Sequence, residues 1–299
     1  MKINLIEKDL IQDNQIEIIF VKSVDGLGDS EILEILDFKA KDESCILLVE
    51  SKKIYIGYEE SSYDSLAIAS ATAIKKLQTT KFENAKIILN EDLKANFKGL
   101  IEGLFLGEYK FVNYKSEKEK RKINVEIVID GENQVLETIL KESKIIAKAV
   151  NKTRDMVNTP PADFYPKTMA KKAKKIAQDL ELDIRVEGEK FLEENGMNAM
   201  LSVGRASVHE SQLIHLTYKP NDAKKKIVLV GKGLTYDSGG LSLKPADFMV
   251  TMKADKSGGC AVLSTIWAIA KLGLPLEVHG IVGAVENMIG GNAYKPDDV

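Results

Sequence analysis

Cysteine and histidine are scarce in this 299-residue sequence. The two cysteines, Cys45 and Cys260, stand far apart and form no CxxC spacing, so neither a disulfide scaffold nor a cysteine zinc site is predicted. The three histidines, His209, His215 and His279, fit no HExxH spacing. A histidine-based zinc protease site is therefore not expected, and each histidine is predicted to be structural.

Long apolar runs and an excess of one charge are also missing. The longest charge-free run, Ser257–Ala270, is shorter than the roughly 20 residues that span a bilayer. Glu7, Lys8 and Asp9 stand where a signal peptide would be apolar. With 42 basic and 45 acidic residues the net charge is −3, which disfavours a dedicated nucleic-acid binder. We expect a cytoplasmic protein with small or peptidic ligands, no membrane partner and no nucleic acid.

The first part of the chain alternates β-rich runs with helical patterns. At 44% hydrophobic and 29% charged residues the composition is that of a globular protein, long enough for two domains. The spacing predicts a helix over Tyr63–Gln78. It predicts strands at Ile16–Val21, Cys45–Val49, Ile54–Gly57, Ala85–Leu89 and Asn124–Ile129. This alternation is typical of an α/β layer fold.

A long helical pattern follows Asn133 and must end before Pro160. We therefore predict an N-terminal α/β domain at 1–135, a linking helix at 136–157 and a second domain at 158–299. In the second domain Pro166 suits the first turn of another helix. The apolar run Ile227–Val230 is predicted to be a central strand covered on both faces and closed by Gly231.

The glycine-rich segment 231–245 contains most of the candidate functional residues. It lacks the GxxxxGK[ST] spacing of a phosphate loop, and Tyr236 stands where a dinucleotide fingerprint needs its third glycine. The same tyrosine breaks the GxSxG pattern of a serine hydrolase around Ser238. Metal chemistry remains as the candidate.

Two aspartates could serve as metal ligands: Asp237 in the glycine segment, and Asp255 just ahead of a predicted helix. Taken singly, each has a simpler interpretation, since Asp255 could cap that helix and Asp237 could form a turn. Lys232, between glycines, could be a solvated turn lysine, and Lys244 before a proline says little alone. Together, the two aspartates and two lysines indicate a metal site more strongly than any one of them does alone.

Several segments resemble the leucyl (cytosol) aminopeptidases, which are two-metal exopeptidases. The similar segments are Glu102–Phe111 (EGxxLGxYxF), Asn158–Asp163 (NTPP), Gly231–Lys244 (GKGITFDSGGISIK), Met252–Gly259 (M(K/R)xDMxG) and Glu286–Val299 (ENMPSGxAxRPGDV). The resemblance implies an N-terminal α/β domain followed by the first part of a mixed-sheet α/β metallopeptidase catalytic domain. It implies release of apolar, leucine-like residues from peptides with a free N-terminus, by water activated between two metal ions.

The same resemblance implies roles for individual residues. Lys232, Asp237 and Asp255 would ligate two divalent ions, Zn²⁺ or Mn²⁺, with Asp237 reaching both. Lys244 would polarise the substrate, and Met252 would line an apolar pocket for its first side chain. The complete protein would be a homo-hexamer and would use bicarbonate as a base.

Two departures from the family pattern stand out. Lys256-Ser257 and Ile289-Gly290 replace the family's usual residues, and the sequence stops at Val299, before the family's NTDAEGR segment. We therefore expect a catalytic domain incomplete at its C-terminus. The alternatives are a non-catalytic scaffold or DNA-binding protein of the same fold, or an inactive fragment lacking the remaining metal ligands. A phosphate-ligand enzyme is a third and weaker alternative.

Overall fold

The computed structural model describes residues 1–8, 15–116, 121–291 and 293–299. The chain separates into two compact units, an N-terminal unit, Met1–Lys148, and a C-terminal unit, Ala149–Val299. Each unit packs helices against a mixed sheet, which confirms the predicted fold class. Within these described ranges no helix has the length and apolarity needed to cross a bilayer.

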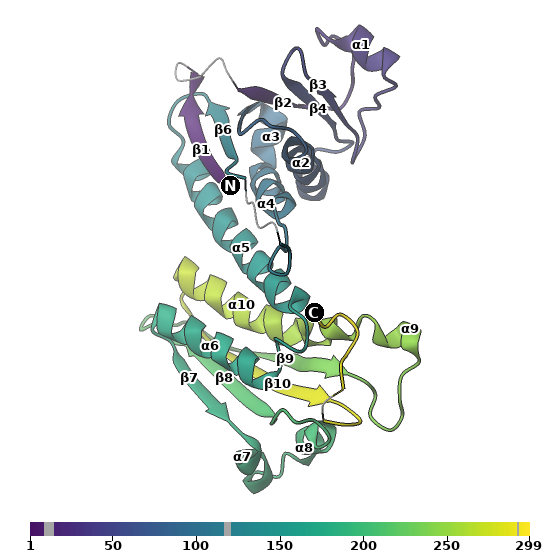
Figure 1. Ribbon diagram of the computed structural model, residues 1–299. Helices are drawn as coiled ribbons and strands as arrows, with labels where there is room; N and C mark the ends of the chain where they lie inside the picture. The colour runs from purple at the N-terminus through teal and green to yellow at the C-terminus, as the bar shows by residue number, and fades with distance from the viewer. Residues whose placement is uncertain (9–14, 117–120, 292) are drawn as a thin grey trace. The chain divides into compact units, whose positions relative to one another are not determined.

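The N-terminal unit is built on a six-stranded sheet in the order β1-β6-β5-β2-β4-β3 (Figure 1). Its strands are parallel except for β3, which runs antiparallel to β4. The strands are β1 Lys2–Glu7, β2 Ile16–Val21, β3 Cys45–Leu48, β4 Lys53–Gly57, β5 Asn84–Ile88 and β6 Asn124–Ile129. The apolar runs predicted every strand except β1, an edge strand whose residues are at most half-buried.

The helices of this unit are α1 Ser30–Ile35, α2 Tyr63–Gln78, α3 Glu91–Ala95, α4 Phe97–Gly107 and the first part of α5, Gln134–Asn158. Helix α2 has the predicted bounds and is capped by Ser62, whose side chain accepts a hydrogen bond from the Ser65 amide. Helix α4 packs closely on α2 at Gly103, where an added Cβ would lie 2.3 Å from the Ala67 carbonyl oxygen. The division between the units falls inside α5.

The C-terminal unit contains a four-stranded sheet in the order β7-β8-β10-β9. Strand β10 runs parallel to β9 and antiparallel to β8, and β7 is antiparallel to β8. The strands are β7 Asp183–Glu187, β8 Gln212–Tyr218, β9 Lys225–Asp237 and β10 Leu276–Asn287. The helices are α6 Pro166–Leu180, α7 Glu189–Glu194, α8 Asn198–Gly204, α9 Ala246–Met249 and α10 Ser257–Leu272, with a 3₁₀ turn, η2, at Met252–Lys256.

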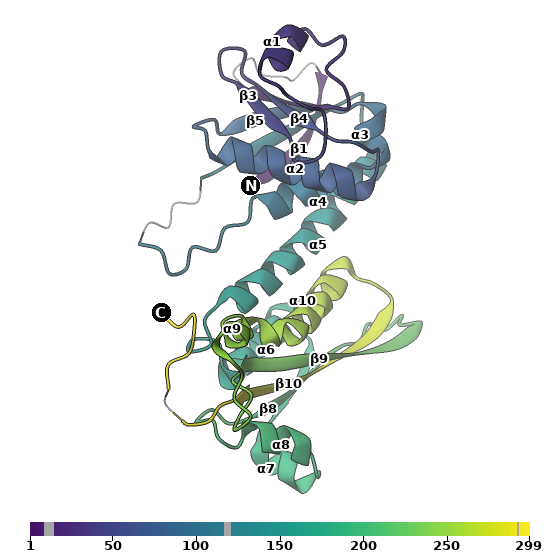
Figure 2. The same cartoon turned by 90° about the vertical axis from the view of Figure 1, so that its right-hand side faces the viewer.

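Helices α6 and α10 cover the same face of this sheet (Figures 1 and 2). The buried residues Val278, Val282 and Ala284 of β10 point to this face. At Gly280, an added Cβ would meet Ile266 of α10 at 2.3 Å. Because side chains alternate along a strand, the residues between these positions point to the opposite face, which we call the open face.

Strand β9 corrects two predictions. It does not close at Gly231 but continues to Asp237, and it is not covered on both faces, because Val228 and Val230 are 53% and 76% exposed. The strand is at the edge of the described sheet, which explains the exposure. It passes through Gly231 because the start of α10 packs directly on the backbone there, where a Cβ would lie 2.8 Å from the Gly258 carbonyl oxygen.

Candidate metal centre

A register shift in β9 positions two of the predicted ligands. Lys232 pairs with Gly283 and Asp237 pairs with Asn287, and between them the ladder skips Thr235. Because Gly283 and Asn287 are an even number of residues apart, Lys232 and Asp237 lie on the same face of the sheet. Without the extra residue they would lie on opposite faces. The Thr235 hydroxyl donates to the Val285 carbonyl oxygen at 3.2 Å.

Asp237 is held by three donors. Its Oδ1 accepts from the Asn287 side-chain amide at 2.7 Å and from the Gly239 backbone amide at 3.0 Å, and its Oδ2 lies 3.1 Å from Lys244 Nζ. Burial acts to raise the pKa of Asp237, but these hydrogen bonds and the lysine charge hold it below its ordinary value. The predicted turn is present, since Gly239 and Gly240 adopt φ of +90° and +70°.

Asp255 lies in η2 rather than at the start of α10. The N-cap residue of α10 is Lys256, so the interpretation of Asp255 as a helix cap is wrong. Its Oδ1 lies 2.9 Å from Lys232 Nζ, while its Oδ2 is buried without a hydrogen-bond partner. Lys232 is accordingly not in a turn; it lies within β9, and its side chain, although 60% exposed, reaches a carboxylate.

The donor set fits a divalent cation. Within the part of the chain that the structure describes, no three His, Cys, Asp or Glu side chains gather into a metal-binding group, so carboxylates alone do not complete a site. Lys232 supplies a nitrogen donor once deprotonated, which a nearby cation promotes. The unpartnered Oδ2 of Asp255 is the kind of buried polar atom that a cation would satisfy.

A buried ionic cluster lies next to Asn287 in the sequence. Glu286 is 2% exposed, accepts from the Ser207 hydroxyl, and has Lys295 Nζ 3.7 Å from its Oε1. Lys295 in turn lies 3.6 Å from Asp298. Sequence reasoning included Glu286 and Asn287 in a motif but gave neither a role. The Asn287 contact with Asp237 could not be deduced because their separation along the chain is 50 residues.

Met252 and Lys244 complete the predicted set. Met252 is half-buried at the first position of η2, three residues before Asp255. Lys244 follows the glycine turn, and its backbone amide donates to the Ser238 carbonyl oxygen at 2.9 Å. The structure thus gathers four predicted residues into two ion pairs, Lys232 with Asp255 and Lys244 with Asp237.

Comparison with known proteins gives consistent matches. Residues 151–299 match the family model described as "Cytosol aminopeptidase family, catalytic domain". A probable cytosol aminopeptidase of Wolinella succinogenes is 47% identical over 287 residues, which are 93% of this chain and 59% of the relative. A probable cytosol aminopeptidase of Helicobacter hepaticus is 48% identical over 267 residues, which are 88% of this chain and 56% of that relative. The chain therefore spans less than two thirds of the length of these relatives.

A solved structure shares the fold. The structure described as "Bottromycin maturation enzyme BotP in complex with Mn" aligns with a TM-score of 0.78 at 26% identity. The alignment covers 94% of this chain and 61% of that one.

Proposed function

The chain belongs to the cytosol aminopeptidase family, and from this premise we propose that it provides the N-terminal domain and the first part of the catalytic domain of a metal-dependent aminopeptidase. The observation that carries the proposal is a set of two ion pairs, Lys232 with Asp255 and Lys244 with Asp237, inside the segment that matches the catalytic domain. The proposed substrates are peptides with a free N-terminus and an apolar, leucine-like first residue.

Lys232, Asp237 and Asp255 are the residues that would hold two divalent ions, Zn²⁺ or Mn²⁺. Bound there, the ions would supply Lewis acidity that lowers the pKa of water and polarises a peptide carbonyl. The chain's own part is to fix the ligands: Asn287 and the Gly239 amide orient the Asp237 carboxylate, and the register shift sets it on the same face as Lys232. Such outer hydrogen bonds tune a ligand's position and basicity.

Lys244 and Met252 are the proposed substrate-contacting residues. The Lys244 ammonium group, 3.1 Å from Asp237, would stabilise negative charge developing on the scissile carbonyl oxygen. Met252, on the same 3₁₀ turn as Asp255, would contribute a flexible apolar wall to the pocket for the first side chain. For the complete protein we further propose a cytoplasmic homo-hexamer that uses bicarbonate.

The test measures metal content and activity together. The full-length gene product, loaded with Zn²⁺ or Mn²⁺, is assayed on leucine p-nitroanilide and analysed for bound metal, beside Asp237→Asn and the control Asp247→Asn, an exposed acid of α9. We expect Asp237→Asn to lose metal and at least 100-fold in turnover, and Asp247→Asn to match the wild type. If the full-length protein neither turns over the substrate nor loses metal on Asp237→Asn, the non-catalytic alternative takes its place.

A further inference from the structure

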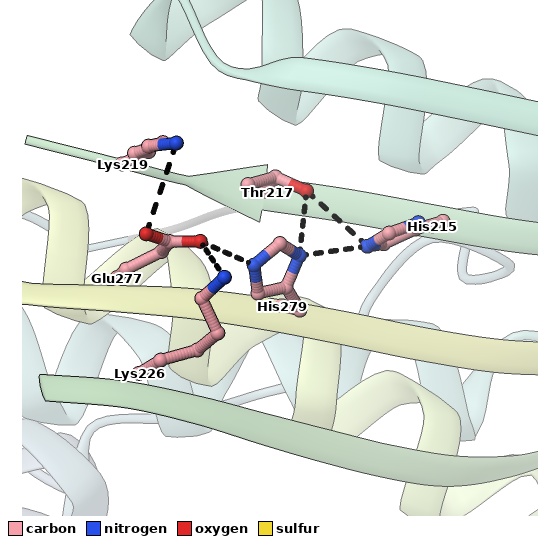
Figure 3. Close-up of polar contacts among 6 residues, drawn as sticks. All are labelled: His215, Thr217, Lys219, Lys226, Glu277 and His279. Carbon is pink, nitrogen blue, oxygen red and sulfur yellow. Dashed lines mark hydrogen bonds and ion pairs between the residues drawn. The ribbon is translucent and has the colours of Figure 1, made fainter.

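A second group of nitrogen donors lies on the open face of the C-terminal sheet, away from the candidate metal centre. His215 of β8 and His279 of β10 are 64 residues apart in the sequence, but His215 Nε2 lies 2.9 Å from His279 Nδ1 (Figure 3). Thr217 pairs with His279 in the ladder, and its hydroxyl lies 3.3 Å from His215 Nε2 and 3.2 Å from His279 Nδ1. Three donor atoms thus form a small triangle.

The protonation of His279 follows from its other contact. His279 Nε2 lies 2.8 Å from Glu277 Oε1, and Lys226 Nζ lies 2.8 Å from the same oxygen. Glu277 Oε1 thus faces two nitrogen donors, an arrangement that suits an ionised carboxylate, which only accepts hydrogen bonds. In the neutral tautomer that donates from Nε2 to Glu277, His279 Nδ1 presents a lone pair to the triangle.

His215 contributes the second imidazole in its neutral form. His215 is half-buried, lies beside His279 and pairs with Arg185 across the ladder, and both the burial and the neighbouring positive charge disfavour an imidazolium. When it is neutral, its hydrogen can reside on either ring nitrogen. In one tautomer Nε2–H donates to His279, and in the other the two lone pairs face each other and need a cation between them.

We propose that His215, His279 and the Thr217 hydroxyl bind one divalent transition-metal ion of the Zn²⁺, Cu²⁺ or Ni²⁺ class. Neutral imidazole suits these ions, which bond nitrogen at about 2.0–2.1 Å, so one ion fits just above the triangle and water fills its remaining positions. The Glu277–His279 contact has the arrangement of a carboxylate that orients a metal-ligating histidine. The site is independent of the proposed aminopeptidase function.

The surrounding charges set how tightly the ion binds. On this face, Arg185 pairs with His215 and Asp183 pairs with Thr217 across the ladder to β7. Lys226 of β9 and Lys219 of β8 approach Glu277, and Lys219 Nζ lies 3.9 Å from its Oε2. The nearby positive charges favour modest affinity. Protons compete for the imidazole lone pairs, so binding weakens as the pH falls.

The two metal sites can be told apart by their ligands. His279 is eight residues from Asn287 along β10, or about 26 Å at 3.3 Å per residue. The proposed ligands of the candidate metal centre are amine and carboxylate groups, whereas the second site supplies imidazole. Two of the chain's three histidines lie at this site, so an imidazole signature that depends on His215 and His279 but not on His209 reports on it.

The experiment loads untagged protein with Cu²⁺ and detects metal-bound imidazole by pulsed EPR, in the wild type and in His215→Gln, His279→Gln and His209→Gln. His209 is the matched control because it is the third histidine and makes its ring contact elsewhere. It stacks on Tyr165, with 4.0 Å between the ring centroids. We expect a two-imidazole signal in the wild type and in His209→Gln, reduced to one imidazole or lost in the other two variants. Absence of the signal in the wild type, or its survival unchanged in His215→Gln and His279→Gln, overturns the proposal.

A second measurement guards against misfolding of the variants. Glu277→Gln keeps both imidazoles but removes the ionised acceptor, and we expect 10–100-fold weaker Zn²⁺ binding at this site in competition with a chelating indicator. Trp267 fluorescence of each variant establishes that the C-terminal unit is folded. The metal proposal fails if folded Glu277→Gln binds Zn²⁺ with unchanged affinity and His279→Gln loses no zinc. The cluster would then be only a hydrogen-bonded contact between strands.

Discussion

The buried Lys256 makes the stability of the C-terminal unit depend on pH in a specific way. Its side chain is fully buried in η2, donates from Nζ to the Thr159 carbonyl oxygen at 2.9 Å, and lies near the ring of Phe164. Burial lowers the pKa of Lys256 from 10.5 to about 8. Between these values the unfolded chain binds more protons than the folded one, so the free energy of unfolding rises with pH.

The magnitude follows from the shift. One pKa unit corresponds to about 1.4 kcal/mol, so the full shift is worth about 3 kcal/mol, of which about 2 kcal/mol develops between pH 7 and pH 9.5. Lys256→Met retains an unbranched apolar chain and removes the titration. Loss of the hydrogen bond to Thr159 lowers the free energy of unfolding equally at both pH values, and so leaves the difference between them unaffected.

Urea unfolding followed by fluorescence provides the assay. Trp267 is the only tryptophan and lies in α10, in the same unit as Lys256. Burial raises the pKa of the Cys260 thiol to about 12, which opposes the trend, and the Lys256 charge also acts on this thiol, so both proteins are compared in a Cys260→Ala background. Lys271→Met, at an exposed lysine in the last turn of α10, is the control. Equal pH dependence in the wild type and Lys256→Met would refute the reasoning.

Three further predictions concern packing, acid stability and metal. Gly103→Ala places a Cβ 2.3 Å from a carbonyl oxygen of α2 and should destabilise the N-terminal unit by about 1–3 kcal/mol. Gly28→Ala is the control, because the space around Gly28 is open and no destabilisation is expected. Thermal melts followed by circular dichroism measure both variants. A hydrogen bond from Lys53 is the largest of the contacts that hold the pKa of Asp29 below its ordinary value of 3.8. The ionised carboxylate therefore stabilises the folded state above pH 3.8, and this stabilisation is lost as the pH falls through the folded pKa. Asp29→Asn should make the free energy of unfolding fall less steeply in acid titrations. Metal at 100 times its dissociation constant should stabilise the C-terminal unit by about 2.7 kcal/mol, and EDTA should reverse this in Trp267-monitored unfolding.

Much of the fold could be predicted from local patterns. The bounds of β2 and β6 follow from apolar runs, and those of α2 follow from helical spacing. Burial of one face of a strand or one stripe of a helix produces these sequence patterns. Strand β9 was misjudged at Gly231, since glycine usually ends a strand pattern. Here the close approach of α10 favours glycine inside the strand, a tertiary effect that local spacing does not contain.

The candidate site could be predicted only in part. The carboxylates of Asp237 and Asp255 indicated metal chemistry, but the pairing of Asp255 with Lys232 depends on a contact between η2 and β9 that local spacing does not contain. The proximity of His215 and His279 was equally hidden. Motif spacing finds histidines on one helix, whereas these two lie on neighbouring strands that an antiparallel ladder brings together.

The unpaired Thr235 makes the candidate metal centre sensitive to chain length more than to side-chain identity. Replacing Leu234 or Thr235 changes packing, but deleting one residue between Lys232 and Asp237 would turn the carboxylate to the other face of the sheet while leaving every proposed ligand in the chain. A one-residue deletion should therefore abolish metal binding where substitutions only weaken it. Engineering of this segment should hold the number of residues fixed and vary their types.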